Sequence, residues 1–128
     1  MSLFMKIIRG ELPSYKVYED EKTFAFLTRD AIALGHTLVI PKVEVDHFAD
    51  VPLDYFLRVH EVSQPLAKAI QKATGCKRVG TAVIGLEVPH FHLHLVPMNS
   101  IADLDFRKAR VYSPEDNLRM QKQIVGAL

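Results

Sequence analysis

Three of the six histidines in the chain stand at alternate positions, His90, His92 and His94. Alternate residues of an extended strand face the same side. The sequence therefore predicts a strand over residues 91–96 with three imidazoles on one face and apolar side chains on the other, where a helix could cover them. The pKa of an ordinary histidine lies close to neutrality, so its neutral and its charged forms are both accessible to chemistry.

A row of imidazoles suits a phosphate group better than a metal ion. A zinc ion needs its ligand nitrogens at about 2.0–2.1 Å, whereas the first and third Cα atoms of the row would lie roughly 13 Å apart on an extended strand. With a phosphate, the middle imidazole can attack the phosphorus atom while its neighbours hold oxygens or assist the leaving group. To attack through one nitrogen, that ring must carry a proton on the other and find an acceptor for it, which the sequence does not identify. A metal site and a strand of solvent-exposed histidines stay open as alternatives.

Strands and helices alternate around this run. Apolar spacing and stop residues predict a short helix over residues 3–9. A long helical segment should begin at Pro52 and end near Gly75, with a kink or break near Gln64 caused by Pro65. Ser113 and Pro114 are typical of a helix start, and the last helix should reach about Gly126. Strands are expected over residues 17–19, 23–28, 37–40, 79–84 and 91–96. This pattern is typical of an α+β domain with a largely antiparallel sheet.

Size and composition limit the other possibilities. The chain has 128 residues, so we expect one domain over residues 1–128. Its formal net charge is only +1, so we do not expect it to bind nucleic acid through the phosphates. No run approaches the ~18 apolar residues of a membrane span. Cys76 is the only cysteine, which excludes an internal disulfide and suits a reducing compartment. These features predict a cytoplasmic protein.

The histidine run, His-Phe-His-Leu-His followed by Leu and Val over residues 90–96, resembles the signature of the histidine triad (HIT) superfamily of nucleotide hydrolases and transferases. Residues 4–13 (FMKIIRGELP) are similar to the amino-terminal segment of that family, and residues 35–42 (GHTLVIPK) to its third strand. Residues 85–89 (GLEVP) look like the bacterial, Hint-like members. The resemblance covers about residues 3–97.

This resemblance implies a five-stranded antiparallel sheet with a long helical segment and terminal helices. It also implies a homodimer that shares one continuous sheet, a purine nucleotide substrate, and no cofactor or metal. By position, His92 matches the family nucleophile. His90 and His94 match flanking residues that contact the phosphate and aid the leaving group, and His36 matches a fourth histidine that supports the triad.

The candidate nucleotide-binding residues are Phe4, Ile7, Phe26, Thr28 and Glu87. The first three match apolar positions around the base, although Ile7 and Phe26 could equally be core residues. Thr28 stands where the family usually has an aspartate that bonds the ribose hydroxyls, and a hydroxyl is a weaker partner for a diol than a carboxylate.

The predicted function is hydrolysis of purine nucleoside phosphoramidates through a covalent nucleotidyl-histidine intermediate. One alternative is hydrolysis of dinucleoside polyphosphates at the same site. Another is a nucleotide-binding or sensing protein with weak catalysis, which is suggested by Thr28 and by Leu86, because Leu86 replaces a glutamine that the family usually has before the triad.

Overall fold

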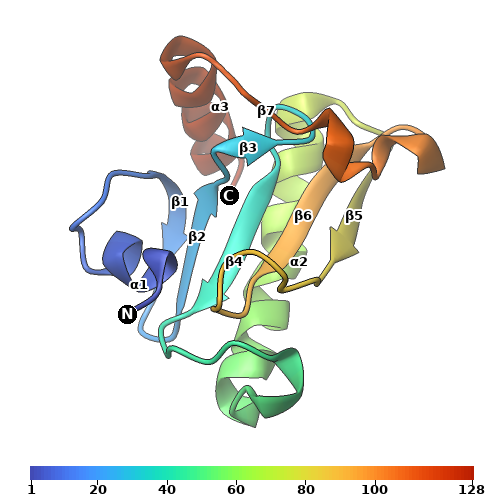
Figure 1. Cartoon of the computed structure of the whole chain (residues 1–128). Coiled ribbons are helices and arrows are strands. Elements are labelled where there is room, and N and C mark those ends of the chain that lie inside the picture. Colours follow the sequence, from blue (N-terminus) through green and yellow to red (C-terminus); the bar gives the residue numbers. More distant parts are fainter.

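The computed structural model describes residues 1–128. Its centre is a five-stranded antiparallel sheet with the strand order β1-β2-β4-β6-β5 (Figure 1). The strands are β1 (Tyr15–Glu19), β2 (Thr23–Leu27), β4 (Thr37–Pro41), β5 (Arg78–Ala82) and β6 (Leu93–Met98). The predicted α+β class and the five-stranded antiparallel sheet are confirmed.

Two helices, α2 (Leu53–Thr74) and α3 (Pro114–Ala127), cover one face of this sheet. Figure 1 shows α2 running behind the strands and α3 beside it. The apolar stripe of α2 packs on the inward side chains of the central strands, and each of these fully buried aliphatic groups contributes roughly 1.5–3 kcal/mol relative to exposure. The main members of this core are Val39, Val59, Val62, Leu66, Ile70, Phe91, Leu93 and Leu95.

Helix α3 begins as the sequence predicts. The Ser113 side chain accepts a hydrogen bond from the backbone N–H of Asp116 at 3.1 Å, and Pro114 occupies the first turn. These residues satisfy or remove backbone donors that a helix start would otherwise leave unpaired.

Helix α1 (Leu3–Ile8) lies on the opposite face of the sheet. Its Phe4 packs with Phe24 and Phe26 of β2 and with Leu38 and Ile40 of β4 in a second, smaller core. Ser2 caps this helix by accepting the backbone N–H of Met5 at 3.1 Å. The face that carries α1 is also the face that carries the triad.

Of the kink or break predicted near Gln64, the break is wrong, because α2 is one continuous helix with Pro65 inside it. The side chain of Pro65 is on the solvent side of the helix, next to the exposed Gln64. Water can therefore solvate the carbonyl of Glu61, which loses its usual donor to the proline. Packing of the buried stripe, which includes Val62 and Leu66 on either side of this point, outweighs the local cost.

Several short elements have no clear signal in the sequence. They are the 3₁₀ turns Phe48–Asp50, Ile101–Asp103 and Phe106–Lys108, and the paired strands β3 (Asp30–Ala31) and β7 (Arg110–Val111). We call residues 99–112 the strap, because this segment runs from the end of β6 across to β3 before α3 begins.

None of the helices has both the length and the apolar run that a membrane span requires.

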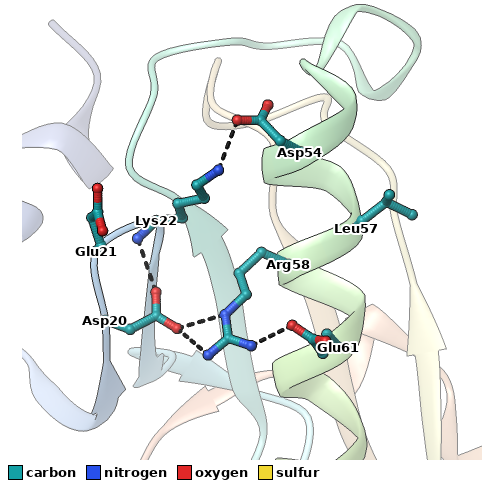
Figure 2. A pocket seen from close by; sticks show the side chains of 7 residues that line it. All are labelled: Asp20, Glu21, Lys22, Asp54, Leu57, Arg58 and Glu61. Atoms are coloured by element: carbon teal, nitrogen blue, oxygen red, sulfur yellow. Dashed lines mark hydrogen bonds and ion pairs between the residues drawn. The ribbon is translucent and has the colours of Figure 1, made fainter.

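A cluster of charged side chains ties α2 to the turn between β1 and β2 (Figure 2). Asp20 is its centre. One carboxylate oxygen accepts the backbone N–H groups of Lys22 and Thr23 and the Thr23 hydroxyl, at 2.8–2.9 Å. The other oxygen accepts Tyr18 Oη–H and Arg58 Nε–H, both at 2.9 Å. Burial alone would raise the pKa of Asp20, but these hydrogen bonds outweigh it and hold the pKa well below its usual range.

Asp20→Ala is expected to lower the free energy of unfolding by about 2–3 kcal/mol, because it leaves the donors of Thr23, a fully buried residue, without a partner. Urea unfolding at neutral pH measures the loss. Asp54→Ala is the matched control, since its pair with Lys22 (2.8 Å) lies at the exposed rim of the same cluster and should matter little. Equal losses from the two variants would contradict the central role of Asp20.

Candidate active site

The three triad histidines are all buried, but they do not form a row on one strand. Strand β6 begins at Leu93, so only His94 lies in the sheet. The chain leaves the ladder before that point because β4 ends at Pro41, whose carbonyl accepts a hydrogen bond from the His90 ring at 2.9 Å rather than from a strand partner. The backbone N–H of Phe91 instead pairs with Val45 O at 2.7 Å. The prediction of a strand from Phe91 is therefore wrong by two residues, and the alternative of exposed histidines does not hold.

His92 is held in one tautomer. Its Nδ1 lies 2.7 Å from the carbonyl oxygen of His90. A carbonyl can only accept, so Nδ1 carries the proton and Nε2 carries the lone pair. Nε2 makes no hydrogen bond within the protein, and no fully buried side-chain nitrogen or oxygen lacks a partner, so this nitrogen reaches open space. The His90 carbonyl is the acceptor that the sequence could not identify.

His36 and His94 form a second pair with a fixed direction. The backbone N–H of Ile32 donates to His36 Nδ1 at 3.1 Å, which leaves the proton of a neutral His36 on Nε2. That Nε2–H then donates to His94 Nδ1 at 2.9 Å. His94 must therefore carry its own proton on Nε2, which has no partner in the protein and reaches open space. The pair presents one N–H donor next to the lone pair of His92, with the two ring centres 4.9 Å apart.

Both ring nitrogens of His90 form hydrogen bonds within the protein. Its side chain is fully buried, with Nε2–H donating to Pro41 O and Nδ1 bonded to the Ser2 hydroxyl, each at 2.9 Å. Neither ring nitrogen is left for a phosphate oxygen. The geometry supports a different role from the one that the resemblance implies, because His90 holds His92 through its backbone carbonyl.

Burial keeps these imidazoles neutral. Burial, with a smaller contribution from the neighbouring histidines, lowers the pKa of His36 to about 3 and that of His94 to about 4. The pKa of His90 is also lowered, again mainly by burial. Near pH 7 the groups around His92 are therefore hydrogen-bonding dipoles and not cations.

Two phenylalanine rings bracket the triad. Phe4 packs edge-on against His92, with ring centres 5.0 Å apart. On the other side, Phe106 of the strap lies 5.0 Å from His94 and 6.4 Å from His36. Nothing in the sequence pointed to Phe106, since it belongs to a segment without family motif or regular periodicity. Ser2 was missed as well, although a serine just before an apolar helix is a recognisable capping signal.

Ile7 and Phe26 border a cavity of about 400 Å³, a size typical of small-molecule sites, although no triad histidine lines it. Phe26 contacts Phe4 at 5.5 Å between ring centres, and Phe4 contacts His92. The cavity is thus two rings away from the nucleophile candidate. Phe26 is also part of the small core, so the core and the ligand interpretation both apply to it.

The other two nucleotide-binding candidates, Thr28 and Glu87, do not line this cavity. Thr28 follows β2 and is half-buried, and its backbone N–H donates to His36 O at 3.1 Å. Asp30, the nearest carboxylate, is exposed and pairs with Val111 in the β3–β7 ladder. Glu87 is exposed in the loop before the triad, and the neighbouring Leu86 is 88% exposed.

The charged hollow of Figure 2 is the other large concavity, but its groups already neutralise one another. Arg58 pairs with Asp20 and Glu61, and Lys22 pairs with Asp54. No group of three or more His, Cys, Asp or Glu side chains converges as a metal site requires. The arrangement best suited to covalent chemistry is therefore the lone pair of His92 beside the N–H of His94.

Comparisons with known proteins identify the family and the fold. The family model described as HIT domain matches residues 9–101. The chain is 32% identical to Protein hit of Bacillus subtilis over an alignment of 136 positions, gaps included, that covers 98% of this chain and 93% of that protein. It is 34% identical to adenosine 5'-monophosphoramidase HNT1 of Saccharomyces cerevisiae over 96 residues, covering 74% of this chain and 61% of that one. The crystal structure of a Hit-like protein from Bartonella henselae superposes with a TM-score of 0.88 at 30% identity, over 99% of this chain and 96% of that chain.

Proposed function

The chain belongs to the HIT family, and on that premise we propose that it hydrolyses purine nucleoside phosphoramidates with His92 as the nucleophile. The observation that carries the proposal is the fixed tautomer of His92, whose Nδ1–H is held by His90 O at 2.7 Å while Nε2 stays open. The name of the yeast relative, an adenosine 5'-monophosphoramidase, supports the same reaction class.

In the first step, the lone pair of His92 Nε2 forms a bond to the α-phosphorus. The P–N bond of the substrate breaks, and its electron pair leaves with the nitrogen, which takes a proton from solvent and departs as the amine. The phosphorylated imidazole becomes cationic because Nδ1 keeps its proton, and the His90 carbonyl stabilises that charge. Water then attacks the phosphorus, releases the nucleoside monophosphate and returns His92 as a neutral imidazole.

His94 supplies a hydrogen bond to a phosphoryl oxygen. Its Nε2–H is the only proton that it can offer, because Nδ1 accepts from His36. A donor placed in advance stabilises the charge that grows on the phosphoryl oxygens without any rearrangement. His36 and His90 are positioning residues in this account, the first through His94 and the second through its carbonyl. The reaction as written needs no cofactor.

The leaving group should be a neutral amine and not an anionic phosphate. Two of the three basic side chains of the strap are paired, Arg107 with Asp105 at 2.9 Å and Lys108 with Asp103 at 3.8 Å. The third, Arg110, stacks on the ring of Tyr112. A dinucleoside polyphosphate would bring several negative charges to this side of the site, where the two basic residues that follow Phe106 already pair with carboxylates. We therefore expect phosphoramidates to be better substrates than polyphosphates.

A substrate panel tests the ranking. The expected kcat/KM for an adenosine phosphoramidate is at least about tenfold above that for a diadenosine polyphosphate, a barrier difference of about 1.4 kcal/mol. A higher kcat/KM for the diadenosine polyphosphate would favour a dinucleoside polyphosphate hydrolase. Tight nucleotide binding with no turnover of any compound would favour a sensing protein, for which Thr28 and the exposed Leu86 are the motivating features.

We also propose that the protein is a homodimer, as the resemblance implies, and that it is cytoplasmic with one HIT domain per chain, as its size and composition suggest. Strand β5 ends the sheet on one side and has no partner beyond it. An unpaired edge of this kind can pair with the same edge of a second copy.

A further inference from the structure

The cavity beside Phe26 contains one buried polar side chain with an unused acceptor. Asn117, in the first turn of α3, is only 7% exposed and lines the cavity. Its Nδ2 donates to the carbonyl oxygen of Tyr112 at 3.3 Å, whereas Oδ1 makes no hydrogen bond within the protein. Since no fully buried side-chain oxygen lacks a partner, Oδ1 borders open space.

The direction of this amide is fixed by its partner. Rotating the amide by half a turn would set Oδ1 against the Tyr112 carbonyl, two acceptors with no proton between them. Helix α3 holds the residue in place, because the backbone N–H of Asn117 donates to Ser113 O at 3.0 Å. Asn117 therefore offers an acceptor to whatever occupies the cavity.

Arg29 lines the same cavity from the end of β2. Its guanidinium is exposed and takes part in none of the ion pairs of the protein, so its donors are available. The remaining wall is mostly apolar, with Ile7, Phe26 and Val111 among its members. A mostly apolar cavity that offers the Asn117 acceptor and the Arg29 donors, with Ser14 and Tyr15 also in its lining, fits a flat heterocycle that presents a donor next to an acceptor.

We propose that Asn117 reads the base of the substrate and selects 6-aminopurines over 6-oxopurines. This inference rests on the proposed function, because it places the base in the cavity and the phosphorus at His92, with Phe4 between them. The exocyclic amino group of adenine donates to Asn117 Oδ1, and the adjacent ring nitrogen accepts from Arg29. In hypoxanthine both groups are inverted, so that a carbonyl faces Oδ1 and a ring N–H faces the guanidinium.

The test compares adenosine and inosine phosphoramidates, which differ at this edge alone. Wild-type kcat/KM should be about 30-fold higher for the adenosine compound. With the inosine compound, the hydrogen bond to Asn117 Oδ1 is replaced by two acceptors that face each other. Binding constants for AMP and IMP, measured by calorimetry, should show the same preference. The wild-type ratio needs no variant, so it stays informative if a substitution unfolds the protein.

Asn117→Leu should reduce the preference to about threefold or less, mainly through weaker use of adenosine. Gln121→Leu is the matched control. It makes the same change of amide to alkyl on the same helix, and it also removes a donor to a backbone carbonyl, Lys16 O at 2.7 Å, but outside the cavity lining. It should keep the wild-type ratio. Thermal unfolding of both variants verifies that they are folded.

The outcomes separate this inference from the proposed function. Turnover of both substrates without preference, or a preference that Asn117→Leu retains, overturns base reading by Asn117 and leaves the hydrolase proposal standing. Selective binding of AMP that Asn117→Leu abolishes, without turnover by wild type, supports the inference and overturns the hydrolase. Failure of both nucleotides to bind overturns both.

Discussion

His92→Ala should lower kcat for an adenosine phosphoramidate by at least about 10⁴-fold, because the variant has no group to form the covalent intermediate. None of the other triad-associated imidazoles can take over. Both nitrogens of His36 and His90 are hydrogen-bonded, and His94 presents a proton and not a lone pair. Single-turnover assays with enzyme in excess measure the loss.

The fold should survive this substitution. His92 makes one side-chain hydrogen bond, to His90 O, and its other nitrogen reaches open space. Far-UV circular dichroism and the unfolding midpoint should stay close to wild type. His60→Ala is a suitable control, since His60 is an exposed histidine of α2 on the far face of the sheet. Normal turnover by folded His92→Ala would remove the basis of the proposed mechanism.

Acid should weaken the fold well above the range in which carboxylates titrate. An ordinary histidine has a pKa of about 6.5 when unfolded, but burial holds the pKa of His36 at about 3 and that of His94 at about 4 in the folded protein. Between these values the unfolded chain binds protons that the folded chain does not. The stabilising contribution is therefore complete above the unfolded pKa and is lost as the pH falls toward the folded values.

The free energy of unfolding should fall by about 2–4 kcal/mol between pH 7 and pH 5, since each such histidine costs up to about 1.4 kcal/mol per pH unit in this window. Urea unfolding at a series of pH values measures the slope. His36→Asn removes one titrating group, so its slope should be smaller whatever its absolute stability. A flat profile in wild type, or an unchanged slope in His36→Asn, would show that these imidazoles are not buried in neutral form.

Much of the scaffold could be predicted because its signals are local and periodic. The stripe of α2, the Ser113–Pro114 start of α3 and the apolar strands each satisfy a regular spacing. The continuity of α2 through Pro65 could not be read from these signals, because it depends on which side of the helix faces solvent. The strap has no such spacing, and its place over His94 depends on the pairing of β7 with β3.

The sequence distinguished the middle histidine of the run from its neighbours, but it did not distinguish the two neighbours from each other. The pattern of residues 90–94 favoured the middle ring as the nucleophile and gave both flanking rings the same supporting role. Hydrogen bonds from distant parts of the chain distinguish them. Ser2 and Pro41 bond to both ring nitrogens of His90. Ile32 fixes the tautomer of His36, which in turn fixes the tautomer of His94. Tautomers depend on such partners, and partners of this kind are fixed only when the chain has folded.

The most direct test of the account is detection of the covalent intermediate. Wild type and His92→Ala are mixed with a limiting amount of an adenosine phosphoramidate, quenched in alkali, which preserves a phosphorus–imidazole bond, and analysed by intact mass and peptide mapping. The account predicts a transient adenylyl adduct on the peptide that contains His92, formed before AMP appears, and neither adduct nor AMP from His92→Ala. Release of AMP by both proteins, or an adduct on another residue, would contradict it.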